Sequence, residues 1–158
     1  MSDNKKKNRG KEFEQEILDR AKKYEADRRL ILRKVDPPTR IIRGKIIMCA
    51  NPFLDFCGVW AEKNGRAVFL EAKRTDGSKL KLDCAGGLTK KQLQSMRRWK
   101  AAGAATGIIW RNKIADNFVT MNEVETTLAD GTKHLNAEAC RSRIPYMDFL
   151  RVMNQCFY

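Results

Sequence analysis

Apolar residues recur along the chain at spacings that predict a mixture of helices and strands. Segment 11–28 repeats its apolar residues every three or four positions, as is typical of an amphipathic helix. Thr89 can cap a second helix that runs to about residue 102, and Pro145 suits the first turn of a closing helix. Short apolar runs predict strands at 30–32, 53–60, 66–74, 106–110 and 118–121. This order predicts an α/β fold with a central mixed sheet flanked by helices.

Polar and glycine-containing segments separate these elements. Residues 1–10 form a basic tail that we expect to be flexible, and residues 11–158 form one domain. Two prolines at 37–38 interrupt regular structure before segment 39–48, where two Ile-Ile pairs flank a basic turn that contains glycine. We interpret 39–48 as a short β-hairpin arm that projects from the domain. Residues 75–88, rich in glycine and lysine, predict a loop.

The chain is strongly basic. Its 32 lysine and arginine residues exceed its 19 acidic residues and give a formal net charge of +13. Such a surplus attracts polyanions, most commonly nucleic acid, with an anionic membrane as the rival partner. No stretch approaches the roughly 20 apolar residues that span a bilayer, and no apolar signal region follows the basic N-terminus. We therefore expect a DNA-binding protein with no membrane association, in the cytoplasm of a prokaryote or bacterial host.

Cysteine and histidine offer no catalytic pattern. The five cysteines are widely spaced without a Cys-x-x-Cys pair, and the single histidine, His134, has no cysteine at zinc-ligand spacing. One histidine also gives no basis for a Ser-His-Asp or Cys-His mechanism. We interpret the cysteines as reduced thiols of a cytosolic protein.

Two carboxylates and a lysine stand inside apolar strands. Asp55 follows Phe53 and Leu54, and Glu71 and Lys73 come after four consecutive apolar residues. Burying ionised groups is costly unless they are compensated, and Mg²⁺, which prefers oxygen ligands, would compensate the carboxylates. Residues two apart in a strand share a face, so Glu71 and Lys73 project together. A Glu-x-Lys pair alone is more typical of an ion pair on an edge strand. The four apolar residues before this pair and the upstream Asp55 in an apolar strand favour a metal-dependent site instead.

The turn between these two strands decides whether Asp55 can join Glu71. A two-residue Asn64-Gly65 turn would place Asp55 opposite Arg74, on the wrong face. We therefore predict a one-residue offset, through either a three-residue loop with Gly65 in a bulge or a bulge near Gly58.

A third carboxylate can come from the first helix. Glu14 borders the apolar stripe of segment 11–28 and so can face the sheet. Stabilisation of the helix dipole by acids in the first turn explains its position equally well. The two explanations remain open at this stage.

Short motifs in this order resemble RecU-type Holliday junction resolvases, including phage-encoded relatives, of the PD-(D/E)xK nuclease superfamily. Archaeal junction resolvases share a looser form of the pattern. The matching segments are 10–14 (GKEFE), 38–39 (PT), 55–58 (DFCG), 69–75 (FLEAKRT), 91–96 (KQLQSM) and 142–145 (SRIP). The resemblance implies a restriction-endonuclease-like fold and a homodimer that cuts a DNA four-way junction symmetrically, with the arm directed toward the junction centre. This arm is shorter than is typical of bacterial members.

The resemblance also implies roles for individual residues. Asp55, Glu71 and Ala72 would hold the metal together with Glu14 on the helix, Lys73 would be the catalytic lysine, and Gln92 would support the site. The implied cofactor is Mg²⁺, with Mn²⁺ able to substitute, and no small-molecule cofactor is expected. Whether Lys73 acts as a base or neutralises phosphate charge stays open.

Basic residues near these motifs are candidate phosphate contacts. The isoleucine pairs of the arm either pack on exposed bases or cover the dimer partner. The candidate contacts are Lys5, Lys6, Lys7, Arg40, Arg43, Lys45, Arg74, Lys79, Lys81, Lys90 and Lys91.

The leading function is thus structure-selective, metal-dependent hydrolysis of phosphodiester bonds at DNA four-way junctions. The alternatives are a PD-(D/E)xK nuclease that acts on linear duplex or flap DNA, and a non-catalytic DNA-binding accessory protein of recombination.

Overall fold

The elements alternate between helix and strand along most of the chain. The computed structural model describes residues 3–36, 39–42, 45–48, 54–140 and 142–157, with the side chains of 3–8, 39–48 and 146 left out. The elements in chain order are α1 (Asp3–Ala26), β1 (Leu30–Lys34), β2 (Thr39–Ile42), β3 (Lys45–Met48), β4 (Phe56–Trp60), η1 (Ala61–Lys63), β5 (Arg66–Arg74), β6 (Lys79–Lys81), α2 (Lys90–Ala101), β7 (Ala105–Arg111), β8 (Asp116–Thr120), α3 (Met121–Ala129), β9 (His134–Asn136), η2 (Pro145–Met147) and α4 (Phe149–Cys156).

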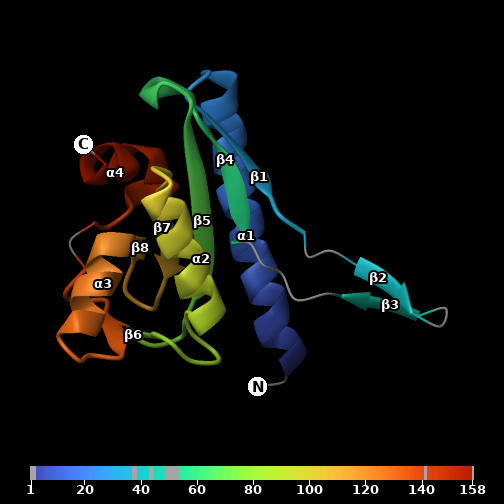
Figure 1. The fold of residues 1–158 in the computed structure, drawn as a ribbon, viewed down its shortest axis with the longest axis vertical. Coiled ribbons are helices and arrows are strands. Elements are labelled where there is room, and N and C mark those ends of the chain that lie inside the picture. The colour runs from blue at the N-terminus through green and yellow to red at the C-terminus, as the bar shows by residue number, and fades with distance from the viewer. Residues whose placement is uncertain (1–2, 37–38, 43–44, 49–53, 141, 158) are drawn as a thin grey trace.

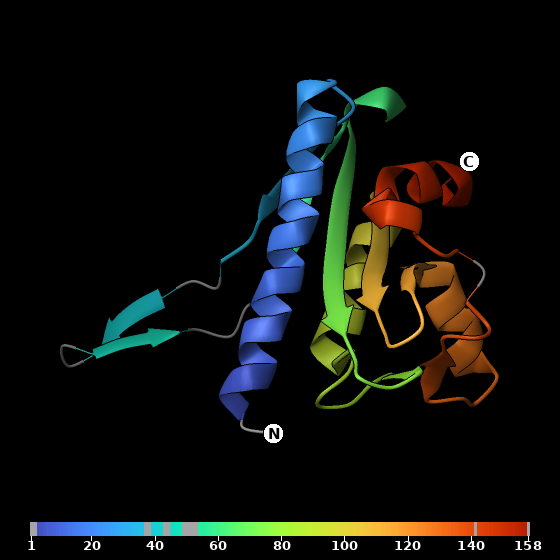
Figure 2. The ribbon, with the colours of Figure 1, turned by 180° about the vertical axis from the view of Figure 1, so that it is seen from behind.

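A five-stranded sheet in the order β1-β4-β5-β7-β8 forms the centre of the fold (Figure 1). The pairing of β5 with β7 is parallel, and the other pairings in this sheet are antiparallel. Helix α1 covers one face, as the view from behind shows, and α2 covers the other face (Figure 2). The predicted α/β fold with a central mixed sheet flanked by helices is confirmed.

Two apolar cores lie on the two faces of this sheet. The first joins α1 and α4 to side chains such as Val68, Leu70 and Ile109, and the second joins α2 and α3 to Ile108 and Trp110. Successive side chains of a strand point to opposite faces, which explains why neighbouring residues of β7 enter different cores. On β5 the same alternation directs residues 69, 71 and 73 to the α2 face.

Several element boundaries differ from the sequence-based expectation. Helix α1 begins at Asp3 rather than Lys11, so most of the segment expected to be a flexible tail is helical; it contains no proline or glycine before Gly10 to stop the helix. The loop expected at 75–88 contains β6, which pairs with β9. Helix α3 was not predicted. No helix in the described ranges is long and apolar enough to cross a membrane.

The predicted arm is present as a two-stranded hairpin. Strands β2 and β3 pair antiparallel, with Thr39 opposite Met48. Both ribbon views show this hairpin extending away from the sheet on the side of β1 (Figures 1 and 2). The predicted break at 37–38, the turn at 43–44 and the start of the strand at 53 lie outside the described residues.

Gly58 permits close contact between β4 and the edge strand β1. A Cβ atom at this position would lie 2.0 Å from the backbone oxygen of Ile31, far inside van der Waals contact. We therefore expect Gly58→Ala to force the two strands apart and to lower the free energy of unfolding by roughly 1–3 kcal/mol. Urea unfolding monitored by circular dichroism measures the change.

Gly77→Ala is the matched control for this prediction. An added Cβ at Gly77 meets nothing within 4 Å. We expect this substitution to change the free energy of unfolding by less than about 0.5 kcal/mol. Equal effects of the two substitutions would show that contact with Ile31 is not what requires glycine at position 58.

Candidate active site

The register of the β4–β5 hairpin brings Asp55 and Glu71 to the same face of the sheet. Phe56 pairs with Leu70 and Trp60 with Arg66, so one further step places Asp55 beside Glu71. The predicted one-residue offset is wrong in size, because the register is shifted by three residues from that of a two-residue turn, but an odd shift has the same effect on the face of Asp55. The cause of the shift differs from both predicted devices, because the connection 61–65 contains a 3-10 turn and ends with Asn64 and Gly65 at positive φ, at 54° and 73°.

Hydrogen bonds from two backbone N–H groups, one on each neighbouring strand segment, fix the position of Asp55. Its Oδ2 atom accepts a hydrogen bond of 2.9 Å from the backbone N–H of Ala72, and its backbone oxygen accepts one of 2.8 Å from Val35. Burial raises the pKa of the Asp55 carboxyl above its ordinary value, and the negative charge of Glu14 adds to this effect. The Ala72 N–H and the charge of Lys73 act in the opposite direction. Asp55 is therefore a fixed carboxylate next to β5.

Glu71 is the most deeply buried acid of the site, with 1% of its side chain exposed. Its Oε1 atom lies 2.8 Å from the Lys73 Nζ atom and also accepts a hydrogen bond from the Gln92 side-chain amide. Its Oε2 atom is buried and has no hydrogen-bond partner among the described residues. Burial, and after it the charge of Asp55, raises the pKa of Glu71 to about 8.

Gln92 connects Glu71 to the start of α2. The Thr89 side chain accepts a hydrogen bond from the Gln92 backbone N–H, and the Gln92 side-chain oxygen accepts one from the Thr89 backbone N–H. This capping box leaves the Gln92 amide nitrogen free to donate to Glu71. The Thr-x-x-Gln spacing thus sets the position of a side chain at the site.

Glu14 lies near this pair but binds another partner. Its Oε2 atom is 2.8 Å from the Lys34 Nζ atom, and its charge still reaches Asp55. No group of three or more His, Cys, Asp or Glu side chains that could hold a metal ion occurs within the described part of the chain. Glu14 as a metal ligand therefore stays a prediction. Lys34, at the end of β1, was not among the residues expected near the site.

The two carboxylates and their surroundings fit a divalent cation. Burial raises the pKa of both carboxyls, and the negative charge of Asp55 raises that of Glu71 further. The Glu71 Oε2 atom is buried and has no donor among the described residues. An unpaired buried carboxylate oxygen is costly, and a cation bound to both groups removes that cost. Carboxylates and a main-chain oxygen such as that of Ala72 are the ligands that Mg²⁺ prefers.

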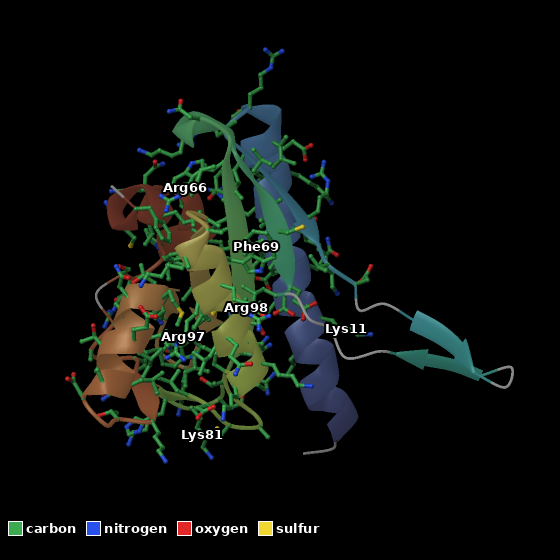
Figure 3. All side chains as sticks on the ribbon, in the orientation of Figure 1. Lys11, Arg66, Phe69, Lys81, Arg97 and Arg98 are labelled. Carbon is green, nitrogen blue, oxygen red and sulfur yellow. The ribbon has the colours of Figure 1, made fainter. Side chains whose placement is uncertain are left out.

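The predicted DNA contacts are only partly within the described side chains. Helix α1 contains Lys5, Lys6 and Lys7, and the arm contains Arg40 and Lys45, but the structure does not describe these five side chains. Arg43 lies outside the described residues. Lys79, Lys81, Lys90 and Lys91 are exposed, while Arg74 is half-buried and donates to the backbone oxygen of Arg9. In Figure 3, Lys81 lies at the end of the molecule near the β5–β6 connection, and Lys11 lies on α1.

Two of the three tryptophans are buried in the fold, and the third, Trp99, is half-buried. Trp60 and Trp110 are fully buried. Trp99 of α2 stacks on Phe69 of β5 with ring centroids 4.1 Å apart and planes at 11°, and Figure 3 shows Phe69 beside this helix. Trp60 and Trp110 therefore belong to the core, and Trp99 anchors α2 against the strand that carries Glu71.

Comparison with known proteins gives matches among solved structures alone. No protein-family model matches the chain, and no curated protein matches it. Among solved structures, the chain is similar to Hjc from Archaeoglobus fulgidus, a Holliday junction resolvase from an archaeal hyperthermophile, with 14% sequence identity. The match has a TM-score of 0.49 and covers 72% of this chain and 78% of that chain.

Proposed function

We propose that this chain is a metal-dependent endonuclease of the PD-(D/E)xK type whose active site contains Asp55, Glu71 and Lys73. One observation carries the proposal: a buried Glu71 lies beside Asp55, contacts Lys73 at 2.8 Å, and keeps an oxygen that has no donor among the described residues. A structural ion pair would not need the second carboxylate, whose charge raises the pKa of Glu71. The arrangement is typical of a site that binds a cation.

Each residue of the site has a defined task in such an enzyme. Asp55, fixed by the Ala72 N–H, and Glu71, fixed by Gln92, would hold Mg²⁺ or Mn²⁺. When bound there, the ion would act as a Lewis acid beside the scissile phosphate. Lys73 exchanges its contact with Glu71 for the phosphate and neutralises negative charge there. Glu14 would complete the ligand set if it left Lys34.

The proposed substrate is a DNA four-way junction, cut by a homodimer. The order of the short motifs supports this choice, and so does the hairpin arm, which extends beyond the sheet on the side of β1 and β4 (Figure 1). A two-fold symmetric dimer presents two equivalent sites to the two-fold symmetric junction. The surplus of 13 positive charges supports binding to DNA of any form.

Cleavage of an immobile junction and of a linear duplex with the same arm sequences tests the substrate. We expect Mg²⁺-dependent paired incisions at symmetric positions in the junction and at least tenfold slower cleavage of the duplex at equal concentration. Equal rates on both substrates would refute the junction selectivity and favour a nuclease of linear or flap DNA. Absence of cleavage in both Mg²⁺ and Mn²⁺, with binding retained, would favour a non-catalytic DNA-binding protein.

A further inference from the structure

A basic cavity lies where β5 and β7 end, beside the first turns of α1. It has a volume of 280 Å³, and an adjoining cavity of 540 Å³ shares part of its wall and reaches Gly10 and Gly86. The residues that line the smaller cavity are Arg9, Arg74, Thr75, Asp76, Arg111, Asn112 and Lys113. None of them belongs to the carboxylate site.

Asn112 offers an unused hydrogen-bond donor at this cavity. Only 8% of the residue is exposed, and its Oδ1 atom accepts hydrogen bonds of 2.7 and 3.0 Å from the backbone N–H groups of Ile114 and Ala115. These two bonds fix the orientation of the amide group. The Nδ2 atom is buried and has no partner among the described residues. A buried donor without an acceptor is costly, and an acceptor oxygen of a ligand placed within reach of Nδ2 would remove that cost.

The charges around Asn112 favour an anion as that ligand. Arg111 is already neutralised by Asp116 and Glu16, at 2.7 and 2.8 Å, and Arg9 pairs with Asp76 at 3.0 Å. Neither Arg74 nor the exposed Lys113 has an acid within salt-bridge distance among the described residues; Arg74 instead donates to the backbone oxygen of Arg9. The cavity therefore combines two uncompensated cations with one neutral donor, which suits the oxygens of a phosphate group.

The position of Arg74 relates this cavity to the active site. Arg74 follows Lys73 directly in β5, and successive side chains of a strand point to opposite faces. Arg74 and its neighbour in the register, Arg111, face α1, whereas Lys73 lies with Glu71 on the α2 face. The two sites thus lie on either side of the end of β5, and one bound anion cannot occupy both.

We propose that Asn112, Arg74 and Lys113 bind a backbone phosphate of the DNA substrate other than the one that is cleaved. The inference deepens the proposed nuclease function and rests on it for the identity of the ligand. In this arrangement a DNA strand passes around the end of β5, with the scissile phosphate at Lys73 and a neighbouring phosphate held in the cavity. The second contact fixes the position of the strand without taking part in the chemistry.

Asn112→Asp is the most selective variant with which to test this site. The carboxylate keeps an oxygen that accepts from Ile114 and Ala115, so the turn is retained, but a negatively charged acceptor replaces the Nδ2 donor. We expect junction binding in chelator to weaken roughly tenfold, measured at a temperature at which circular dichroism shows both proteins to be folded. Lys113→Ala should lower the slope of log affinity against log salt by about one. Lys23→Ala is the control, because Lys23 is exposed and about 21 Å further along α1 than Arg9.

The side-chain amide signal of Asn112 in ¹⁵N NMR spectra identifies the ligand directly. The signal is assigned by its loss in Asn112→Asp, and we expect it to shift when metal-free junction DNA is added. A shift with inorganic phosphate but not with DNA would mean an adventitious ion only and would overturn the proposal. Unchanged binding of Asn112→Asp would overturn it as well. Because these measurements need no cleavage, an inactive protein whose binding still depends on Asn112 would refute the nuclease and leave this phosphate site standing.

Discussion

Replacing Asp55 with Asn will abolish Mg²⁺-dependent cleavage while DNA binding is retained. Asn keeps an oxygen that can accept the hydrogen bond from the Ala72 N–H, so the local structure is preserved. It removes one of the two negative charges that would hold the cation. Because a bound metal contributes several kcal/mol to stabilising the transition state, the expected loss in the single-turnover rate is about 10³-fold or more. Quenched-flow cleavage of a labelled junction measures the rate, and gel shift in chelator measures binding.

Asp130→Asn is the matched control for this substitution. Asp130 follows α3, is exposed, and lies outside the residues assigned to the site. Its variant should cut at the wild-type rate, since the same change in charge is made away from Glu71. Normal cleavage by Asp55→Asn would remove Asp55 from the metal site and leave Glu71 without its partner carboxylate.

The candidate site could be anticipated from sequence because its central residues lie in one hairpin. Alternation along β5 places Glu71 and Lys73 on one face of the sheet. Whether the turn before β5 has an even or an odd number of residues then determines the face on which Asp55 lies. The shift in register was predictable from the demand that Asp55 join Glu71. The cause of this shift could not be predicted, because the 3-10 turn at Ala61–Lys63 depends on how the chain packs against Arg29. The backbone oxygen of Arg29 accepts a hydrogen bond from the Ala61 N–H.

Residues that reach the site from distant segments were harder to anticipate. Gln92 was expected only through resemblance, although Thr89-x-x-Gln92 is a local capping signal; nothing in that signal points to Glu71, which lies 21 positions earlier. Lys34 and Asn112 have no local signal at all. The contact of Lys34 with Glu14 depends on how α1 packs on β1, and the unused donor of Asn112 is visible only once its oxygen is known to bind the turn.

Helix α3, which the apolar pattern does not predict, has a capping signal in the sequence. Thr120 and Glu123 form a capping box at the start of α3, in which the Thr120 side chain accepts from the Glu123 backbone. The apolar run at 118–121 predicts a strand up to Met121, whereas the Thr120-x-x-Glu123 pair indicates that a helix begins directly after Thr120. The early start of α1 had no comparable signal, because a basic segment without proline is compatible with both a helix and a tail.

Metal-free protein should become less stable as the pH rises from about 5 to 8, and Glu71→Gln should remove much of this dependence. Burial and the charge of Asp55 raise the pKa of Glu71 to about 8 in the folded chain, from 4.5. Between these values the folded state binds more protons than the unfolded state, so the free energy of unfolding falls as the pH rises. Gln carries no titrating proton, and its variant should therefore be more stable than the wild type at pH 8 by roughly 1–3 kcal/mol.

Urea unfolding in chelator at pH 5.5 and pH 8 tests this prediction for both proteins. Other titrating groups contribute nearly equally to the two chains, so the difference between them isolates the carboxylate pair. Added Mg²⁺ should stabilise the wild type at pH 8, where Glu71 can release its proton to bind the ion, and should have little effect on the variant. A stability difference that is the same at both pH values would show that Glu71 is not held protonated by its surroundings. The repulsion between the buried carboxylates of Asp55 and Glu71, which makes this hairpin a candidate metal site, would then be absent.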